Sequence, residues 1–185
     1  VAHVADTPVV LVAPVAAAAT AATATVASVA VTAAVVPADH DWDFRGCSNG
    51  APVVDSAGGL EATLINQATC TAEGVSLDGV DDYVDLEDWA WGGTLSIEQY
   101  LRRDSLGLWS TSFCFGTGTY NNNVYLSNKS TGSVIRWSVR LGSTQLFVDA
   151  GSWAVNVWEH FVVTVSGTTM KLYKNGVLIS TNTNG

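Results

Sequence analysis

Positive charge is scarce in this chain. Only 8 residues are lysine or arginine, against 17 aspartate and glutamate residues, and the formal net charge is −9. The few basic residues are scattered, and an acidic surface repels phosphate backbones, so we expect no nucleic-acid partner. An acidic chain is compatible with calcium, with neutral sugars or with a basic protein surface. The hydrophobic share of 48% in 185 residues suffices for one packed domain.

Charge of either sign is missing from residues 7–38. Between Pro14 and Pro37, residues 15–36 contain only alanine, valine, threonine and one serine. As a helix this stretch would be about 33 Å long, enough to span a bilayer core. Its small residues would also suit close packing against other helices. We therefore treat residues 1–39 as a separate segment. It is either a membrane-embedded or packed helix, with 15–36 touching a membrane or membrane complex, or an extended strap. A low-complexity linker and a processed leader are further alternatives.

Cysteine is limited to three residues, and no C-x-x-C pair occurs, which removes support for a zinc site or a thioredoxin-like motif. Cys47 and Cys70 each flank a segment that we interpret as extended. We predict a disulfide between them, which would stabilise the fold by about 3 kcal/mol and indicate an oxidising compartment. The alternative is two buried thiols. Cys114 lies in an apolar strand pattern and is expected to be a free core thiol.

Strand and turn patterns begin near residue 40. The clearest is a meander at 160–165, 169–174 and 177–181, with Ser166-Gly167 and Asn175-Gly176 at its turns. No helical periodicity separates the strands, so we predict that residues 40–185 form an all-β, two-sheet antiparallel sandwich. Trp158 and His160 share one face of a predicted strand, and we expect both rings to close the core.

Several blocks in this region carry a family resemblance, and their order and spacing agree. They are Trp42-Asp43-Phe44, Asp55-Ser56-Ala57-Gly58-Gly59, Leu77 to Val84, Leu95-Ser96-Ile97-Glu98, Asp104-Ser105-Leu106, Phe115-Gly116, Trp158 to Thr164 and Lys171 to Leu178. Over about residues 40–185 the chain resembles the laminin-G-like domains of the concanavalin A-like lectin/glucanase superfamily. The resemblance implies a jelly-roll sandwich. Such domains usually continue with two more strands, so we expect the chain to stop before its last strands.

The resemblance also implies a calcium site. Related domains often bind a structural calcium ion beside the Asp-Ser-x-Gly loop, and oxygen ligands suit this hard cation. On this basis we expect Asp43 and Asp55 to be metal ligands.

The sequence lacks the catalytic motif expected of a hydrolase in this superfamily. Endoglucanases of this superfamily carry Glu-x-Asp-x-x-Glu on one strand, and none of the five glutamates here begins that pattern. We therefore predict a non-catalytic recognition module that binds carbohydrate. The alternative is a scaffolding accessory subunit of a larger complex, such as a membrane-bound one, anchored by its N-terminal segment, and a glycoside hydrolase is a distant third.

A sugar site needs aromatic platforms and hydrogen-bonding groups. The candidate platforms and polar residues are Trp89, Trp91, Trp109, Trp153, Tyr120, Asn121, Asn122 and Asn123. Asn128-Lys129-Ser130 is a glycosylation sequon between two predicted strands, so we expect a glycan on Asn128. With the disulfide, it indicates an extracytoplasmic location: secreted, at a cell surface or in an organelle lumen.

Overall fold

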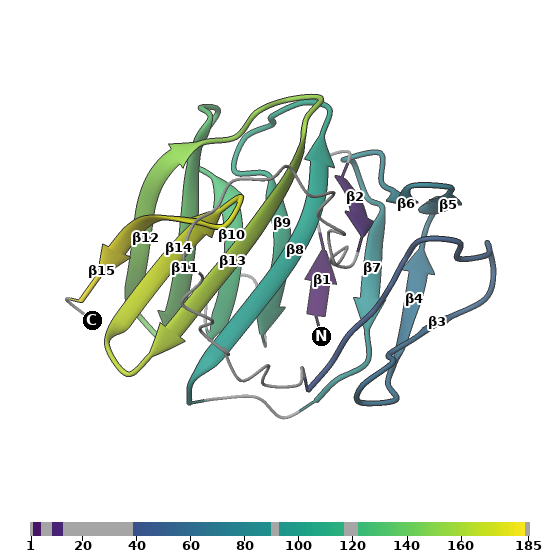
Figure 1. The fold of residues 1–185 in the computed structure, drawn as a ribbon, viewed down its shortest axis with the longest axis horizontal. Helices are drawn as coiled ribbons and strands as arrows, with labels where there is room; N and C mark the ends of the chain where they lie inside the picture. The colour runs from purple at the N-terminus through teal and green to yellow at the C-terminus, as the bar shows by residue number, and fades with distance from the viewer. Residues whose placement is uncertain (1, 5–8, 13–38, 90–92, 117–121, 184–185) are drawn as a thin grey trace, which may run out of the picture.

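The computed structural model describes residues 2–4, 9–12, 39–89, 93–116 and 122–183. These residues form two β-sheets that lie face to face, and no helix occurs among them (Figure 1). All pairings between named strands are antiparallel, as expected of a jelly-roll sandwich. The predicted all-β sandwich is therefore confirmed.

Sheet A has eight strands. In spatial order they are β12 (Thr144–Ser152), β11 (Val134–Leu141), β10 (Asn123–Asn128), β9 (Thr111–Gly116), β1 (Ala2–Val4), β7 (Tyr83–Leu86), β4 (Glu61–Ile65) and β3 (Val53–Val54). Sheet B has seven strands: β15 (Val177–Asn182), β14 (Thr169–Lys174), β13 (Trp158–Ser166), β8 (Leu95–Arg103), β2 (Val9–Val12), β6 (Gly74–Ser76) and β5 (Thr69–Thr71).

The C-terminal meander has the predicted turns. The turn between β14 and β15 is Asn175-Gly176, and both residues have positive φ angles, of 50° and 78°. This backbone conformation matches the right-handed twist of the flanking strands, and asparagine and glycine adopt it at low cost. The turn after Ser166 likewise contains Gly167 with φ 55°. Local sequence therefore fixes the pairing of β13, β14 and β15.

The core lies between the sheets and is closed by large side chains from both. Phe113 and Trp137 of sheet A are fully buried, as are Phe161, Met170 and Leu172 of sheet B. The predicted disulfide between Cys47 and Cys70 is present, with 5.6 Å between the Cα atoms, which is within the usual range. Cys114 is a free cysteine, as predicted, but it is not a core thiol: it is only partly buried and alternates with Phe113 and Phe115, whose side chains face the core.

Two strands from the N-terminal segment belong to the sandwich. β1 is paired with β7 and β9 in sheet A, and β2 with β6 and β8 in sheet B. The division at residue 39 stays a prediction, and residues 15–36 lie outside the described residues. Among the residues described, no helix has the length and hydropathy needed to cross a membrane.

The expectation for Trp158 and His160 is wrong. Glu159, Phe161 and Val163 are the buried residues of β13, so the alternate residues occupy its outer face. There the Trp158 ring stacks on Tyr100 with 5.1 Å between centroids, and His160 is within 2.7 Å of Glu98. β13 is apolar on both faces, and only the packing of the two sheets decides which face is inside.

Candidate functional site

The outer face of β10, β11 and β12 gathers aromatic, charged and amide side chains. Along β11, Ile135 and Trp137 are fully buried, so Arg136, Ser138 and Arg140 alternate onto the opposite face of the sheet. The register of β11 with its two neighbours then brings side chains from three strands together. We call this surface the β10–β12 face.

Arg136 is the centre of this face. Its guanidinium binds the Asp149 carboxylate in two places, with Nε–Oδ1 at 2.6 Å and Nη2–Oδ2 at 2.7 Å. Arg136 and Asp149 are register partners on β11 and β12, which fixes the planar pairing. The guanidinium also lies 4.1 Å from the ring centroid of Phe147 and 5.3 Å from that of Trp109. Lys129 Nζ adds a second cation 2.9 Å from Asp149 Oδ2.

The charges of this cluster are held in their ionised forms. The side-chain hydrogen bonds from Arg136 are the largest influence on Asp149 and outweigh its partial burial, and with Lys129 they lower its pKa. The same pairing raises the pKa of Arg136. The cluster therefore presents a fixed guanidinium and a fixed carboxylate rather than groups that titrate near neutrality.

A second set of polar groups adjoins the cluster on the same face. Gln145 Nε2 donates to the Tyr125 hydroxyl at 2.7 Å and to Ser138 Oγ at 2.9 Å. Gln145 Oε1 accepts from Arg140 Nη2 at 3.1 Å. Because each side chain is held by its neighbour, the face offers hydrogen-bonding groups in fixed positions.

Of the predicted platforms among the described residues, Trp109 lies on this face, and it is 41% exposed. Its backbone has φ 54°, and its N–H donates to Ser130 O at 2.8 Å. Phe147 supplies a second ring and is also 41% exposed. The two partly exposed rings can pack against the apolar face of a small polar ligand. The neighbouring guanidinium and carboxylate can form hydrogen bonds with the hydroxyl groups of that ligand.

Asn128 ties the loop that carries Trp109 to the loop after β10. It is fully buried, and its Nδ2 donates to the carbonyl oxygens of Gly107, Ser130 and Gly132 at 2.9, 2.7 and 3.0 Å. A glycan would have to be attached to this same nitrogen. The structure therefore argues against the expected glycosylation, because the sequon lies in a strand end and not on an open loop.

Trp153 does not fit its predicted role as a platform. Its side chain is only 4% exposed and packs against Phe161, with 4.5 Å between ring centroids. The Arg103 guanidinium covers the other part of the ring at 4.0 Å, and the indole N–H donates to Ser127 O. A sugar cannot reach this ring without unfolding the core.

The remaining predicted residues are dispersed. Trp89 is half-buried against the core, in an aromatic group with His40, Trp42 and Phe115. Asn122 is exposed and accepts a hydrogen bond from Gly142 N. Asn123 is buried, but as the register partner of Arg140 it belongs to the β10–β12 face. Three other predictions, Trp91, Tyr120 and Asn121, lie outside the described residues.

Most of the face was not predicted from the sequence. The residues missed are Tyr125, Lys129, Arg136, Gln145, Phe147 and Asp149. The available signal was the alternation of polar and apolar residues in 134–141 and 145–149, which marks one solvent-facing side of each strand. Alternation gives no register, however, so it could not show that Arg136 faces Asp149.

Asp43 and Asp55, the predicted calcium ligands, have separate partners. Arg45 binds both oxygens of Asp43 on the surface. Asp55 is buried and accepts from Asp41 N at 2.7 Å, from Ala57 N at 2.9 Å and from His40 Nδ1 at 2.6 Å. These contacts involve different partners for the two carboxylates, so the described part of the chain does not bring them into one site.

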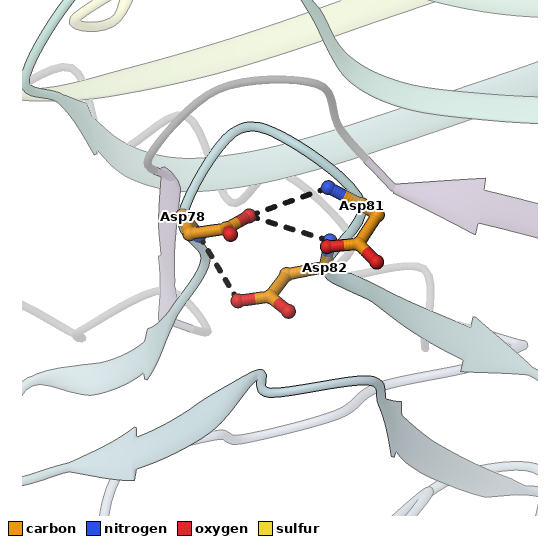
Figure 2. Close-up of side chains that lie close together, drawn as sticks. All are labelled: Asp78, Asp81 and Asp82. Atoms are coloured by element: carbon orange, nitrogen blue, oxygen red, sulfur yellow. Dashed lines mark hydrogen bonds between the residues drawn. The ribbon is translucent and has the colours of Figure 1, made fainter.

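A different acidic cluster lies in the loop between β6 and β7. Carboxylate oxygens of Asp78, Asp81 and Asp82 lie within 4.8 Å of one another (Figure 2). Asp82 is buried and accepts from Gln67 N and Asp78 N, so it holds the loop together. Asp78 and Asp81 are exposed, and Oδ1 of Asp78 accepts from Val80 N at 2.8 Å. Oxygen ligands on a turn are a donor set that fits a hard cation.

Comparison with known families gives one match. The family model described as the concanavalin A-like lectin/glucanases superfamily, of the laminin-G type, matches residues 78–185, which is more than half of the chain. The matched span contains β7 to β15 and so includes every strand of the β10–β12 face. No curated protein and no solved structure matches the chain.

We predict that Asp55 makes stability depend on pH in acid. Burial raises the pKa of Asp55, but hydrogen bonds from Asp41, Gly58, His40 and Ala57 outweigh it, so the pKa lies far below its usual range. An unfolded aspartate titrates near pH 3.9. The stabilisation is therefore complete above about pH 5 and is lost as pH falls toward the folded pKa. Between about pH 5 and 2.5, the free energy of unfolding measured in urea should fall more steeply with decreasing pH for the wild type than for Asp55→Asn. If it falls equally steeply for both proteins, Asp55 is not the source of the acid sensitivity.

Asn128→Ala should destabilise the fold by about 1–3 kcal/mol, because a fully buried amide that donates to three carbonyl groups is removed. Urea unfolding monitored by circular dichroism measures the change. Ser130→Ala is the matched control, since it removes the sequon and leaves Asn128 in place; it should change stability by about 0.5 kcal/mol or less. Equal losses in the two variants would show that Asn128 does not hold the loops.

Proposed function

Because the chain belongs to the concanavalin A-like lectin/glucanases superfamily, it carries a lectin-like or related module. We propose that this module is a non-catalytic carbohydrate-binding domain and that the sugar lies on the β10–β12 face. The observation that carries the proposal is the pair of partly exposed rings, Trp109 and Phe147, that both lie beside the guanidinium of the Arg136–Asp149 ion pair.

This arrangement matches what a sugar requires. A pyranose has an apolar face that packs on an aromatic ring and equatorial hydroxyl groups that both donate and accept hydrogen bonds. Trp109 and Phe147 supply the rings, while Arg136 and Asp149 supply donors and acceptors whose positions are fixed by their own bidentate pairing. Little side-chain entropy is lost on binding, because the groups are already ordered.

The contacts made by the glutamate side chains support a non-catalytic role. Four of them already serve as acceptors for a cation or a backbone N–H. The pairs are Glu73 with Arg102, Glu98 with His160, Glu159 with Lys174, and Glu87 with the N–H of Glu61. A retaining glycosidase needs two carboxyl groups about 5 Å apart and facing a substrate. The proposal assigns no glutamate to such a pair.

We propose that the protein acts outside the cytoplasm, in an oxidising compartment. The disulfide between Cys47 and Cys70 supports this location, because such bonds persist in oxidising compartments.

Trp109→Ala should weaken glycan binding about tenfold, which corresponds to the loss of one stacking contact of about 1.4 kcal/mol. A glycan array with neutral and uronate-containing oligosaccharides identifies the sugar, and titration calorimetry with that sugar measures the change. Trp158→Ala is the matched control, because its indole lies on the outer face of sheet B. It should bind the sugar as the wild type does.

The opposite pattern, in which Trp158→Ala loses binding and Trp109→Ala does not, would move the site to sheet B. Absence of binding across the array would favour the scaffolding function. Turnover of a β-glucan would overturn the non-catalytic assignment.

We further propose that Asp78 and Asp81 hold a calcium ion, which would stabilise the loop between β6 and β7. The clustering of three carboxylates and the exposure of these two support it. In this proposal the calcium ion that the family resemblance implies binds at this loop. Asp43 and Asp55 are then structural residues, which bind Arg45 and the N–H of Asp41, respectively.

Calcium at a hundred times its dissociation constant should stabilise the protein by about 2.7 kcal/mol, seen as a rise in melting temperature. Asp81→Asn should abolish that rise, while Asp104→Asn, an exposed aspartate beside Arg102, should retain it. An equal calcium effect in both variants would exclude this cluster as the site.

A further inference from the structure

The few basic residues of this acidic chain are concentrated on the β10–β12 face. The chain has 17 acidic residues and only 8 basic ones. Residues 105–158 reverse this balance, because they contain Lys129, Arg136 and Arg140 but a single acidic residue, Asp149. Contacts on the β10–β12 face include all four. This face therefore has an excess of positive charge in a protein whose formal net charge is −9.

The carboxylate of Asp149 does not cancel this excess. It binds Arg136 at 2.6 and 2.7 Å and Lys129 Nζ at 2.9 Å. One negative charge is thus shared between two cations, and the three groups together keep one positive charge. The pairing also lowers the pKa of Asp149 and raises that of Arg136, so these two charges persist over a wide pH range.

Lys129 carries the accessible part of this charge. Its side chain is 50% exposed, compared with 11% for that of Arg136. An ammonium group has three N–H groups, and the contact with Asp149 engages one of them. The other N–H groups of Lys129 can therefore donate to an anionic group of a ligand.

Backbone hydrogen bonds hold Lys129 close to the loop of Trp109. Lys129 N donates to Val134 O at 2.8 Å, and Lys129 O accepts from Gly132 N at 3.1 Å. The carbonyl of the next residue, Ser130, accepts from Trp109 N at 2.8 Å. The ammonium group and the proposed stacking ring thus belong to adjoining loops that a hydrogen bond joins directly.

We propose that the sugar bound on the β10–β12 face is acidic, with a single carboxylate as in a uronate, and that Lys129 selects it. This inference rests on the proposed sugar site. In a uronate the carboxylate is bonded directly to the pyranose ring, so a ring stacked on Trp109 keeps its carboxylate near the stacking surface. A charge-assisted hydrogen bond from Lys129 to that carboxylate is stronger than a bond to the hydroxymethyl group of a neutral sugar.

The number of charges favours a sugar with one anionic group. Arg136, Lys129 and Asp149 have one positive charge in excess, which a single carboxylate matches. A heavily sulfated chain would bring several negative charges and would extend over a protein whose formal net charge is −9. The field of the whole protein disfavours such a ligand.

Titration calorimetry with matched pairs of oligosaccharides tests the inference. Each acidic probe carries one glucuronate or galacturonate residue, and its partner is the methyl ester of the same compound, which has the same ring and no charge. The wild type should bind an acid at least about tenfold more tightly than its ester. This preference should shrink as salt rises from about 0.01 M to about 1 M, because the Debye length falls from about 30 Å to about 3 Å.

Lys129→Gln should reduce the preference for the acid to about twofold or less, because Asp149 then balances the one cation still paired with it. Lys129→Arg should retain the preference. Lys171→Gln is the matched control, since it removes the same charge from the outer face of sheet B, where Lys171 alternates with two buried residues of β14. It should show the full preference. Binding of the methyl ester by each variant shows that the variant is folded.

Equal affinity for acid and ester would overturn the inference, and so would binding of neutral sugars alone or a preference that survives in Lys129→Gln. The proposed sugar site would remain in these cases, because sugar still binds. Tighter binding of a sulfated galactose oligosaccharide than of any uronate probe would overturn the assignment of a single carboxylate. If neither acidic nor neutral sugars bind, the proposed sugar site itself is wrong, and the selection by Lys129 falls with it.

Discussion

The burial of Trp137 between the two sheets is the constraint on which the rest of the arrangement depends. Its indole is fully buried, contacts the ring of Phe113 and donates its N–H to Thr164 O on the opposite sheet at 3.3 Å. Once this residue of β11 faces inward, Arg136 and Ser138 must face outward, because successive side chains of a strand point to opposite faces. The β10–β12 face is thus a consequence of how the core is packed.

The same core sets the register that assembles the site. β11 and β12 pair so that Arg136 lies opposite Asp149 and Ser138 lies opposite Phe147. A shift of one residue would move every one of these side chains to the other face. The buried amide of Asn128 then fixes the loop that carries Trp109 beside this ladder. Site geometry and stability therefore rest on the same contacts.

Two buried residues of opposite charge, Arg103 and Glu159, lie on neighbouring strands of sheet B. Arg103 is fully buried, its guanidinium lies over Trp153 and donates to Ser110 O, and burial lowers its pKa to about 9. Glu159 is also buried and binds Lys174. The Arg103 guanidinium covers the ring of Trp153, which the sequence analysis had proposed as a sugar platform. Breaking such a buried arrangement is costly, so the groups support the fold and leave recognition to the outer faces.

Local patterns predicted much of the fold. The Asn175-Gly176 turn, the alternating strands and the pairing of Cys47 with Cys70 were all correct. They could be predicted because a turn dipeptide or a strand period acts over a few residues and barely depends on the rest of the chain. The same reasoning misjudged Trp158 and His160, since a strand with apolar residues on both faces does not reveal which face is buried.

The sequence by itself determined the fold class, the acidic balance, the disulfide and the family blocks. Only the tertiary structure decided which tryptophan is exposed, that Arg136 meets Asp149 across two strands, that Asn128 is a buried anchor, and that β1 and β2 lie inside the sheets. The physical reason is that composition and periodicity are properties of single segments. Register and burial are properties of pairs of segments, and they exist only once both sheets have packed.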